Sequence, residues 1–376
     1  MKLFTTHLPN DKLHAAFKTI INDPQYKATQ SVIQGWGAGL LERKGEQAKF
    51  INEFQTTFNS SLWELYLNKV FIDLGFSVDY TKSSPDFCVT ANLNQFNVEA
   101  VISDHSSGQR DSVDLKNDRQ FKDRCTIKLI GKMKDKLELY NGVRGKKSPY
   151  SSLRHVQGKP FVIAIAPFDS ALSLTQNNEI INRVLFGLES PDKDSLRTGE
   201  QRRIKAIIKP SGARIELGIF TNDSYKEVSA VIFSTTGTFG KAVVESGIER
   251  TIRATYFRKM LLDEFISKEG SGNLGVKQHS LGPENLLITT RIELEGEVFG
   301  SDTHLYKSAS HKETHCDGLH VYYNPYATVP FDPSIMHARE ITHNFYDVEN
   351  DRPIQEHPDG ALVSRQLWSP RSAKLK

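Results

Sequence analysis

The sequence contains few cysteines. Only Cys88, Cys125 and Cys316 occur among the 376 residues, and they lie far apart along the chain. Disulfide scaffolds use several cysteines at short, paired spacings, so this class of small secreted protein is excluded. Isolated cysteines instead fit a reducing compartment.

Long apolar runs are also missing. The longest one, Phe161–Ala166, is far shorter than the roughly 20 residues needed to span a membrane. The first residues have no continuous apolar segment and are interrupted at positions 9 to 11 by proline, asparagine and aspartate, which excludes a signal peptide. We therefore expect a cytoplasmic protein without a membrane span.

The chain has little excess charge of either sign. It has 48 lysines and arginines and 45 aspartates and glutamates, which gives a formal net charge of +3. A basic surface for nucleic acid would therefore have to be local. The 38% hydrophobic and 25% charged residues are typical of a globular protein, and no internal repeat or low-complexity segment is present.

The periodicity of the apolar residues predicts an α/β (α+β) fold. A helical pattern at 62–74 is followed by three short strand patterns, a second long helix at 119–140 and a buried strand at 161–166. This order predicts a mixed sheet with a helical crossover. A helix is expected at 248–267, and strands at 285–295 and 319–323 are expected in a smaller C-terminal portion.

Three carboxylates occur on these apolar elements. Glu64 shares the inward face of the helix at 62–74, Asp86 follows Pro85 in a turn, and Glu99 lies in an apolar strand. Burying such groups costs several kcal/mol unless they are paired, and a divalent metal is a natural partner. For Glu64 an equally weighted alternative is a capping box with Ser61.

The order of helix glutamate, Pro-Asp, turn and strand glutamate resembles the PD-(D/E)XK nuclease superfamily. The segments FQTTFNSSLWELYL, PDF, VEA and GKPFVIAIA are also similar to uncharacterised bacterial members, over residues 50 to 240, and DGLHVYYNPYA at 317–327 extends the likeness. The resemblance implies a restriction-endonuclease-like mixed sheet flanked by helices, with a smaller C-terminal extension. It also implies a nuclease with a role in restriction or phage defence.

The resemblance assigns roles to individual residues. Asp86 and Glu99 would bind Mg²⁺ or Mn²⁺, and Glu64 would complete the site. The superfamily places a lysine two positions after the second acid, but this chain has Val101 there. A lysine moved to the next helix could replace it, with Lys136 as the first candidate and Lys132 as the second. An ordinary solvated helix face is the alternative for both.

DNA is the expected partner under this interpretation, with RNA second, and a homodimer is kept open. The candidate phosphate contacts are the basic residues Arg144, Lys146, Lys147, Arg202 and Arg203. The alternative is a binding module of the same fold that has lost catalysis, with Val101 as the mark of that loss.

A third hypothesis is a zinc-stabilised interaction module. His311, His315, Cys316 and His320 lie close together in sequence, and tetrahedral zinc needs four such ligands. Chance clustering among 12 histidines is the favoured explanation.

The sequence predicts three parts. These are an N-terminal helical segment at 1–45, a nuclease-like core at 46–267 and an accessory region at 276–376. A glycine-rich linker separates the last two.

Overall fold

The computed structural model describes residues 2–43, 45–103, 118–143, 148–168, 178–190, 195, 198, 200–209, 211–260, 276–280, 286–294 and 297–368. Its main feature is an eight-stranded sheet in the order β1-β2-β3-β4-β7-β12-β13-β14. The sheet is mixed, because β3, β4 and β7 run parallel, as do β12 and β13, while the other neighbours are antiparallel. The predicted α/β class is confirmed. The strands are β1 Ser77–Val78, β2 Phe87–Ala91, β3 Asn94–Ile102, β4 Phe161–Ala166, β7 Ala230–Ser234, β12 Leu319–Tyr323, β13 Thr342–Asp347 and β14 Arg352–Glu356.

The crossover between the parallel strands β3 and β4 contains helix α5, Asp118–Asn141. The spacing of Ile130, Met133, Leu137 and Tyr140 predicts its core-facing stripe, and Ile130 and Met133 are buried while Leu137 and Tyr140 are partly buried. Leu129 is also buried. These residues pack with the side chains of β4 and of α6, Glu179–Phe186. This helical layer covers the sheet face to which Glu99 and Val101 point, and so it determines which side chains can reach those strand residues.

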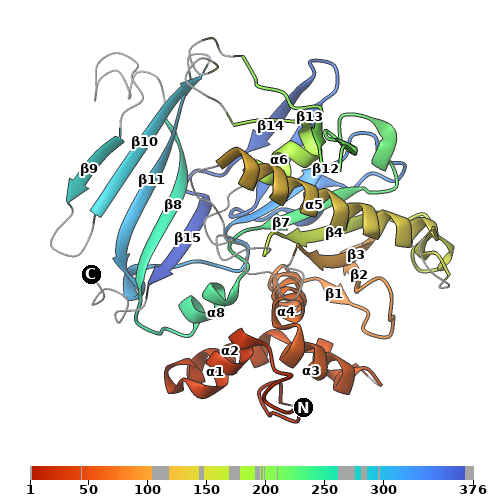
Figure 1. Cartoon of the computed structure of the whole chain (residues 1–376), viewed down its shortest axis with the longest axis vertical. Helices are drawn as coiled ribbons and strands as arrows, with labels where there is room; N and C mark the ends of the chain where they lie inside the picture. The colour runs from red at the N-terminus through yellow and green to blue at the C-terminus, as the bar shows by residue number, and fades with distance from the viewer. Residues whose placement is uncertain are drawn as a thin grey trace.

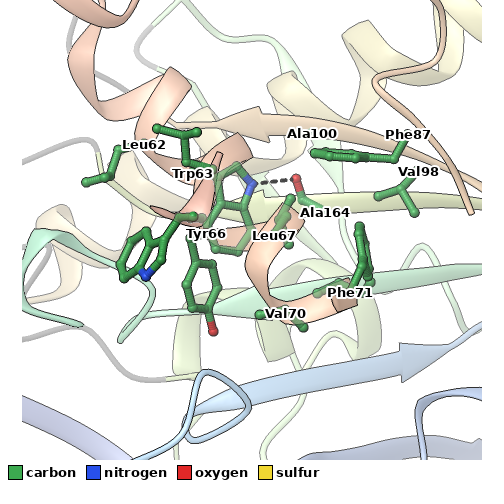
Figure 2. Close-up of a cluster of buried hydrophobic side chains, with 14 of the residues drawn as sticks. Leu62, Trp63, Tyr66, Leu67, Val70, Phe71, Phe87, Val98, Ala100 and Ala164 are labelled. Atoms are coloured by element: carbon green, nitrogen blue, oxygen red, sulfur yellow. Dashed lines mark hydrogen bonds between the residues drawn. The ribbon is translucent and has the colours of Figure 1, made fainter. Parts of the chain in front are cut away.

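The opposite face of the sheet packs on α4, Phe58–Asp73, which lies between the sheet and an outer helical layer (Figure 1). Trp63 is fully buried there, and its Nε1 donates a 3.1 Å hydrogen bond to the carbonyl of Ala164 in β4 (Figure 2). Because α4 has neighbours on both sides, it is apolar around most of its circumference. The outer layer comprises α1 Ala15–Asn22, α2 Lys27–Trp36 and α3 Gln47–Thr56.

A second, five-stranded sheet in the order β15-β8-β11-β10-β9 lies beside the main sheet (Figure 1). The helix predicted at 248–267 is wrong over its described residues, because Thr251–Met260 forms β8. Buried Ile252 and Ala254 alternate with exposed Arg253, the two-residue period of a strand. The other strands are β9 Val276–Ser280, β10 Leu286–Leu294, β11 Glu297–Lys307 and β15 Leu362–Trp368.

The three-part division predicted from the sequence does not match this topology. Strands β12 to β14, from the expected accessory region 276–376, complete the main sheet next to β7. Conversely, β8 from the expected core pairs with β11 and β15. The N-terminal segment 1–45 is helical as expected, and it packs against α4. In the described part of the chain, no helix is both long enough and apolar enough to cross a membrane.

Candidate active site

Glu99 lies in the middle of β3, between β2 and β4, and is only 3% exposed. Its Oε1 accepts a 2.7 Å hydrogen bond from Nζ of Lys136 on α5 and a 3.4 Å hydrogen bond from the hydroxyl of Tyr150. Its Oε2 is buried and has no hydrogen-bond partner among the described residues. The backbone amide of Asp86 also lies close to this carboxylate and opposes the rise in its pKa, so a ligand at Oε2 would bind beside that amide.

Asp86 immediately precedes β2 and lies beside the same part of β3. Its Oδ2 accepts a 2.8 Å hydrogen bond from the backbone amide of Ala100. Its backbone carbonyl accepts a 2.6 Å hydrogen bond from Nη2 of Arg43. The preceding turn is held by His155, whose Nε2 donates to the carbonyl of Ser84 at 2.8 Å. These contacts fix the carboxylate of Asp86 next to Glu99.

Glu64 is half-buried on α4, nearly two turns into the helix. The capping-box alternative is wrong, because α4 begins at Phe58 after the N-cap Thr57, which leaves Ser61 and Glu64 inside the helix. Burial, and then the negative charge of Asp86, raise the pKa of Glu64 well above its usual value. The helix therefore brings a third carboxylate into electrostatic contact with the strand acids.

The four ionisable groups influence one another strongly. Burial raises the pKa of Asp86, although the charge of Lys136 opposes the shift. Burial and Asp86 together raise the pKa of Glu99 to about 7, again against Lys136. Burial alone would lower the pKa of Lys136, but Glu99 and Asp86 hold it above its usual value. The contacts thus bring Asp86, Glu99 and Lys136 together, and Glu64 interacts with them through its charge.

Val101 points to the same side of β3 as Glu99 and is buried against the α5 layer. This position cannot present an amine, as the sequence indicated. Lys136 reaches the carboxylate from α5 instead, with a side chain 19% exposed. For Lys132, one turn earlier, no hydrogen bond or ion pair to the acids is found among the described residues, so the first candidate is the one that the structure places at the site.

Two side chains at the site were missed from the sequence. Tyr150 reaches Glu99 from the short helix η3, Tyr150–Ser152, and Arg43 reaches Asp86 from the N-terminal segment. No spacing pattern connects either residue with the acids, because both contacts depend on how distant segments pack.

Of the predicted phosphate contacts, the two described ones, Arg202 and Arg203, are not brought to the acids. Arg144, Lys146 and Lys147 lie outside the described residues. Arg202 donates to the carbonyl of Ser190. Arg203 packs over the ring of Tyr346 in β13, which places it near the opposite edge of the sheet from β2.

The predicted zinc ligands are held apart by separate partners. His311 contacts Glu313 and Tyr256, whereas His315 bridges Asp73 and Glu245 at 2.6 and 3.0 Å. His320 is buried in β12 between aromatic rings. Burial raises the pKa of the Cys316 thiol to about 12, which disfavours the thiolate that zinc requires.

Within the described residues, no group of three or more histidine, cysteine, aspartate or glutamate side chains is arranged to hold a metal ion. A closed protein cage is therefore not found there. Mg²⁺, however, commonly uses one or two carboxylates and completes its shell with water and phosphate oxygens. Asp86 and Glu99, with the unpartnered Oε2 of Glu99, fit a site of this open kind.

Comparisons of the chain with protein-family models, curated proteins and solved structures found no match. The functional argument therefore depends on the site itself.

Two cavities of about 510 and 470 Å³ lie elsewhere in the described structure, along β13 and β14 and beside the segment from Lys312 to Asp317. Neither is lined by Glu64, Asp86, Glu99 or Lys136. The acids are thus not associated with either of these open hollows, which are of the size that small-molecule ligands use.

Proposed function

We propose that the protein is a metal-dependent nuclease that hydrolyses phosphodiester bonds, in DNA more than in RNA. The observation that carries the proposal is the 2.7 Å contact between Nζ of Lys136 and Oε1 of Glu99, directly beside the carboxylate of Asp86. Two adjacent carboxylates with a lysine provide the hard oxygen ligands and the proton donor that phosphodiester hydrolysis needs. A third carboxylate, Glu64, shares their electrostatic environment.

Each residue has a role in this proposal. Asp86 and Glu99 would hold Mg²⁺ or Mn²⁺, and the charge of Glu64 would tune the site. When bound, the divalent ion supplies Lewis-acid stabilisation of the negative charge that develops on the phosphate. Lys136 has three N–H donors, so the ammonium group can hold Glu99 and still orient an attacking water by hydrogen bonding.

A polymeric substrate is supported by the location of the acids. They lie beside strands near one edge of the sheet, away from the two cavities. A site of this kind suits an extended phosphate backbone better than an enclosed small molecule. The sequence resemblance supports a role in restriction or phage defence, and the scattered cysteines support a cytoplasmic location.

A binding module without catalysis is the second candidate. Val101, buried where a lysine would be expected, is the observation that favours it. Under this alternative, the contact between Lys136 and Glu99 would only neutralise a buried acid.

A cleavage assay with supercoiled, linear and single-stranded DNA and with RNA tests the proposal in Mg²⁺ and in Mn²⁺. Asp86→Asn and Glu99→Gln should each abolish cleavage, whereas Asp79→Asn, an exposed carboxylate on the same hairpin, should retain it. If the wild-type protein cuts none of these substrates with either metal, the nuclease function is wrong and the binding module is favoured.

A further inference from the structure

The segment that follows α2 is docked firmly against the site-bearing part of the fold. The buried side chain of Asn68 on α4 donates to the carbonyls of Trp36 and Ala38 at 2.8 and 3.0 Å. Tyr80 donates to Oδ1 of Asn68 at 2.7 Å. Gly39 has a φ of 76°, and a Cβ there would lie 2.3 Å from the Tyr80 ring, so only glycine fits this approach.

This docking delivers Arg43 to the acid site with most of its hydrogen-bonding capacity unused. A guanidinium carries five N–H donors. Its Nη2 donates to the carbonyl of Asp86, but Nη1 lies 3.9 Å from the nearest oxygen of Glu46. Its Nε is buried without a partner among the described residues, and the side chain is 11% exposed. Glu46 is its ion-pair partner, and the charge of Arg43 also acts on Glu64 and Asp86. Its unused N–H donors can bind a further anionic ligand.

A second cation comes from the same region, because α3 packs against the short helix η2, Leu40–Glu42, which directly precedes Arg43. Lys49 lies on α3, and its positive charge, like that of Arg43, opposes the rise in the pKa of Asp86. Its only described ion pair is with Glu53 at 3.9 Å, and the Lys49 side chain is 71% exposed. An exposed pair of this length contributes little, so the ammonium group remains available to a ligand.

A phosphate backbone that approaches three carboxylates is repelled unless cations flank its path. We propose that Arg43 and Lys49 form this flank and contact DNA phosphates beside the acid site. The N-terminal segment is then one wall of the substrate path. The inference rests on the proposed function for its substrate, and it differs from the phosphate contacts expected from the sequence.

The experiment measures binding separately from cleavage. Fluorescence anisotropy of labelled duplex and single-stranded DNA is recorded in EDTA and in Ca²⁺ over a range of salt concentrations. Arg43→Met and Lys49→Met should each weaken binding roughly three- to tenfold at low salt and reduce the slope of log affinity against log salt by about one. Arg43→Lys should retain part of the affinity, because it keeps the charge.

Lys134→Met is the matched control. Lys134 also forms a 3.9 Å ion pair with a glutamate four residues later, and its side chain is 69% exposed, but it lies on α5 and is not among the charges that act on Asp86. It should bind like the wild type. Lys49 is exposed, so Lys49→Met tests the proposal even if the buried Arg43→Met variant folds poorly.

The outcomes separate this inference from the proposed function. Unchanged affinity and salt slope in both methionine variants, in a wild-type protein that binds DNA, overturn the inference alone. Weakened binding in the two variants of a protein that never cleaves supports the inference and overturns the nuclease. A wild-type protein that binds no DNA overturns both.

Discussion

The ionisation of Glu99 depends on opposing effects of its neighbours. It lies beside the negative charge of Asp86 in a buried strand, and these two causes raise its pKa to about 7. The ammonium group of Lys136 at 2.7 Å acts in the opposite direction. A small change in charge nearby therefore decides whether Glu99 is ionised near neutral pH.

Lys136→Met should reduce cleavage by a factor of about 100 or more, because it removes the group that we propose orients the water. It should also lower the free energy of unfolding by about 1 to 3 kcal/mol, since Glu99 loses its buried partner. Cleavage rates and urea denaturation measure the two effects.

Lys132→Met is the control for this change, because Lys132 lies one turn earlier on the same helix. It should keep both the cleavage rate and the stability of the wild type. If Lys136→Met cleaves at the wild-type rate, the role proposed for Lys136 is wrong, even though the acids would keep theirs.

For single residues, the sequence predicted those whose surroundings are determined by nearby positions in the chain. The Pro-Asp turn and the apolar surroundings of Glu99 pointed to two acids. Because Val101 stands where a lysine was expected, the sequence also indicated that the lysine comes from α5. Arg43 and Tyr150 escaped detection because they contact the acids across 43 and 51 positions of sequence. Such contacts depend on how the N-terminal layer and η3 pack.

Helix α4 packs against the sheet on one side and against the outer helices on the other. Leu67→Ala should lower the free energy of unfolding by about 2 to 5 kcal/mol, because Leu67 is fully buried between these layers. Ile72→Ala, at a position 39% exposed on the same helix, should cost much less. Equal losses in chemical denaturation would contradict the layered arrangement.

Strand β12 contains a histidine that the fold keeps neutral. Burial, and then the charge of His357, lower the pKa of His320 to about 3. The unfolded chain takes up a proton near its ordinary pKa of about 6.5, whereas the native state does not, so stability is lost as the pH falls. Between about pH 7 and about pH 5 this group should cost about 2 kcal/mol.

Urea denaturation of the wild type and of His320→Gln across this pH range measures the effect. The variant should show a smaller loss of stability on acidification. His7→Gln, which alters an exposed histidine, should follow the wild type. An identical pH dependence in all three proteins would assign the loss to other groups.

The elements themselves were predictable where one period dominated. The helix α5, with Ile130 and Met133 of its predicted stripe buried, and the continuous apolar run of β4 were both predicted from the sequence. Strand β8 was predicted as a helix because Thr251–Met260 is flanked by charged sequence that suits a helix surface. Few buried side chains show the two-residue alternation of a strand, so the strand pattern was weak. The start of α4 was predicted four residues late because asparagine and serine resemble caps even when they lie inside a helix.

The whole molecule is organised by strand pairing between distant segments. Leu319 of β12 pairs with Ser234 of β7, and β13 and β14 then extend the sheet. Periodicity can predict that 319–323 is a strand but not which strand it joins, so the expected division into core and accessory region was wrong. The fold class was predictable because it depends only on the order and type of the elements.

A buried charge cluster links the second sheet to the rest of the molecule. Glu313 accepts hydrogen bonds from Nε of Arg365 in β15 at 2.9 and 3.0 Å, and Nζ of Lys241 in α8, Phe239–Glu245, lies 3.3 Å away. His311 completes the cluster at 2.8 Å. These cations hold the pKa of Glu313 far below its usual value despite burial. The carboxylate is therefore ionised throughout the physiological range.

Glu313→Gln should lower the free energy of unfolding by about 3 to 5 kcal/mol, because it leaves Lys241 and Arg365 buried without their counter-ion. Glu349→Gln, at an exposed position, should change stability by less than about 0.5 kcal/mol. Adding Lys241→Met to Glu313→Gln should recover part of the loss, since one uncompensated charge is removed. Urea denaturation followed by circular dichroism measures all three. If Glu313→Gln is as stable as Glu349→Gln, the cluster does not hold the two sheets together, and their association must depend on apolar packing around Ile252 and Leu362.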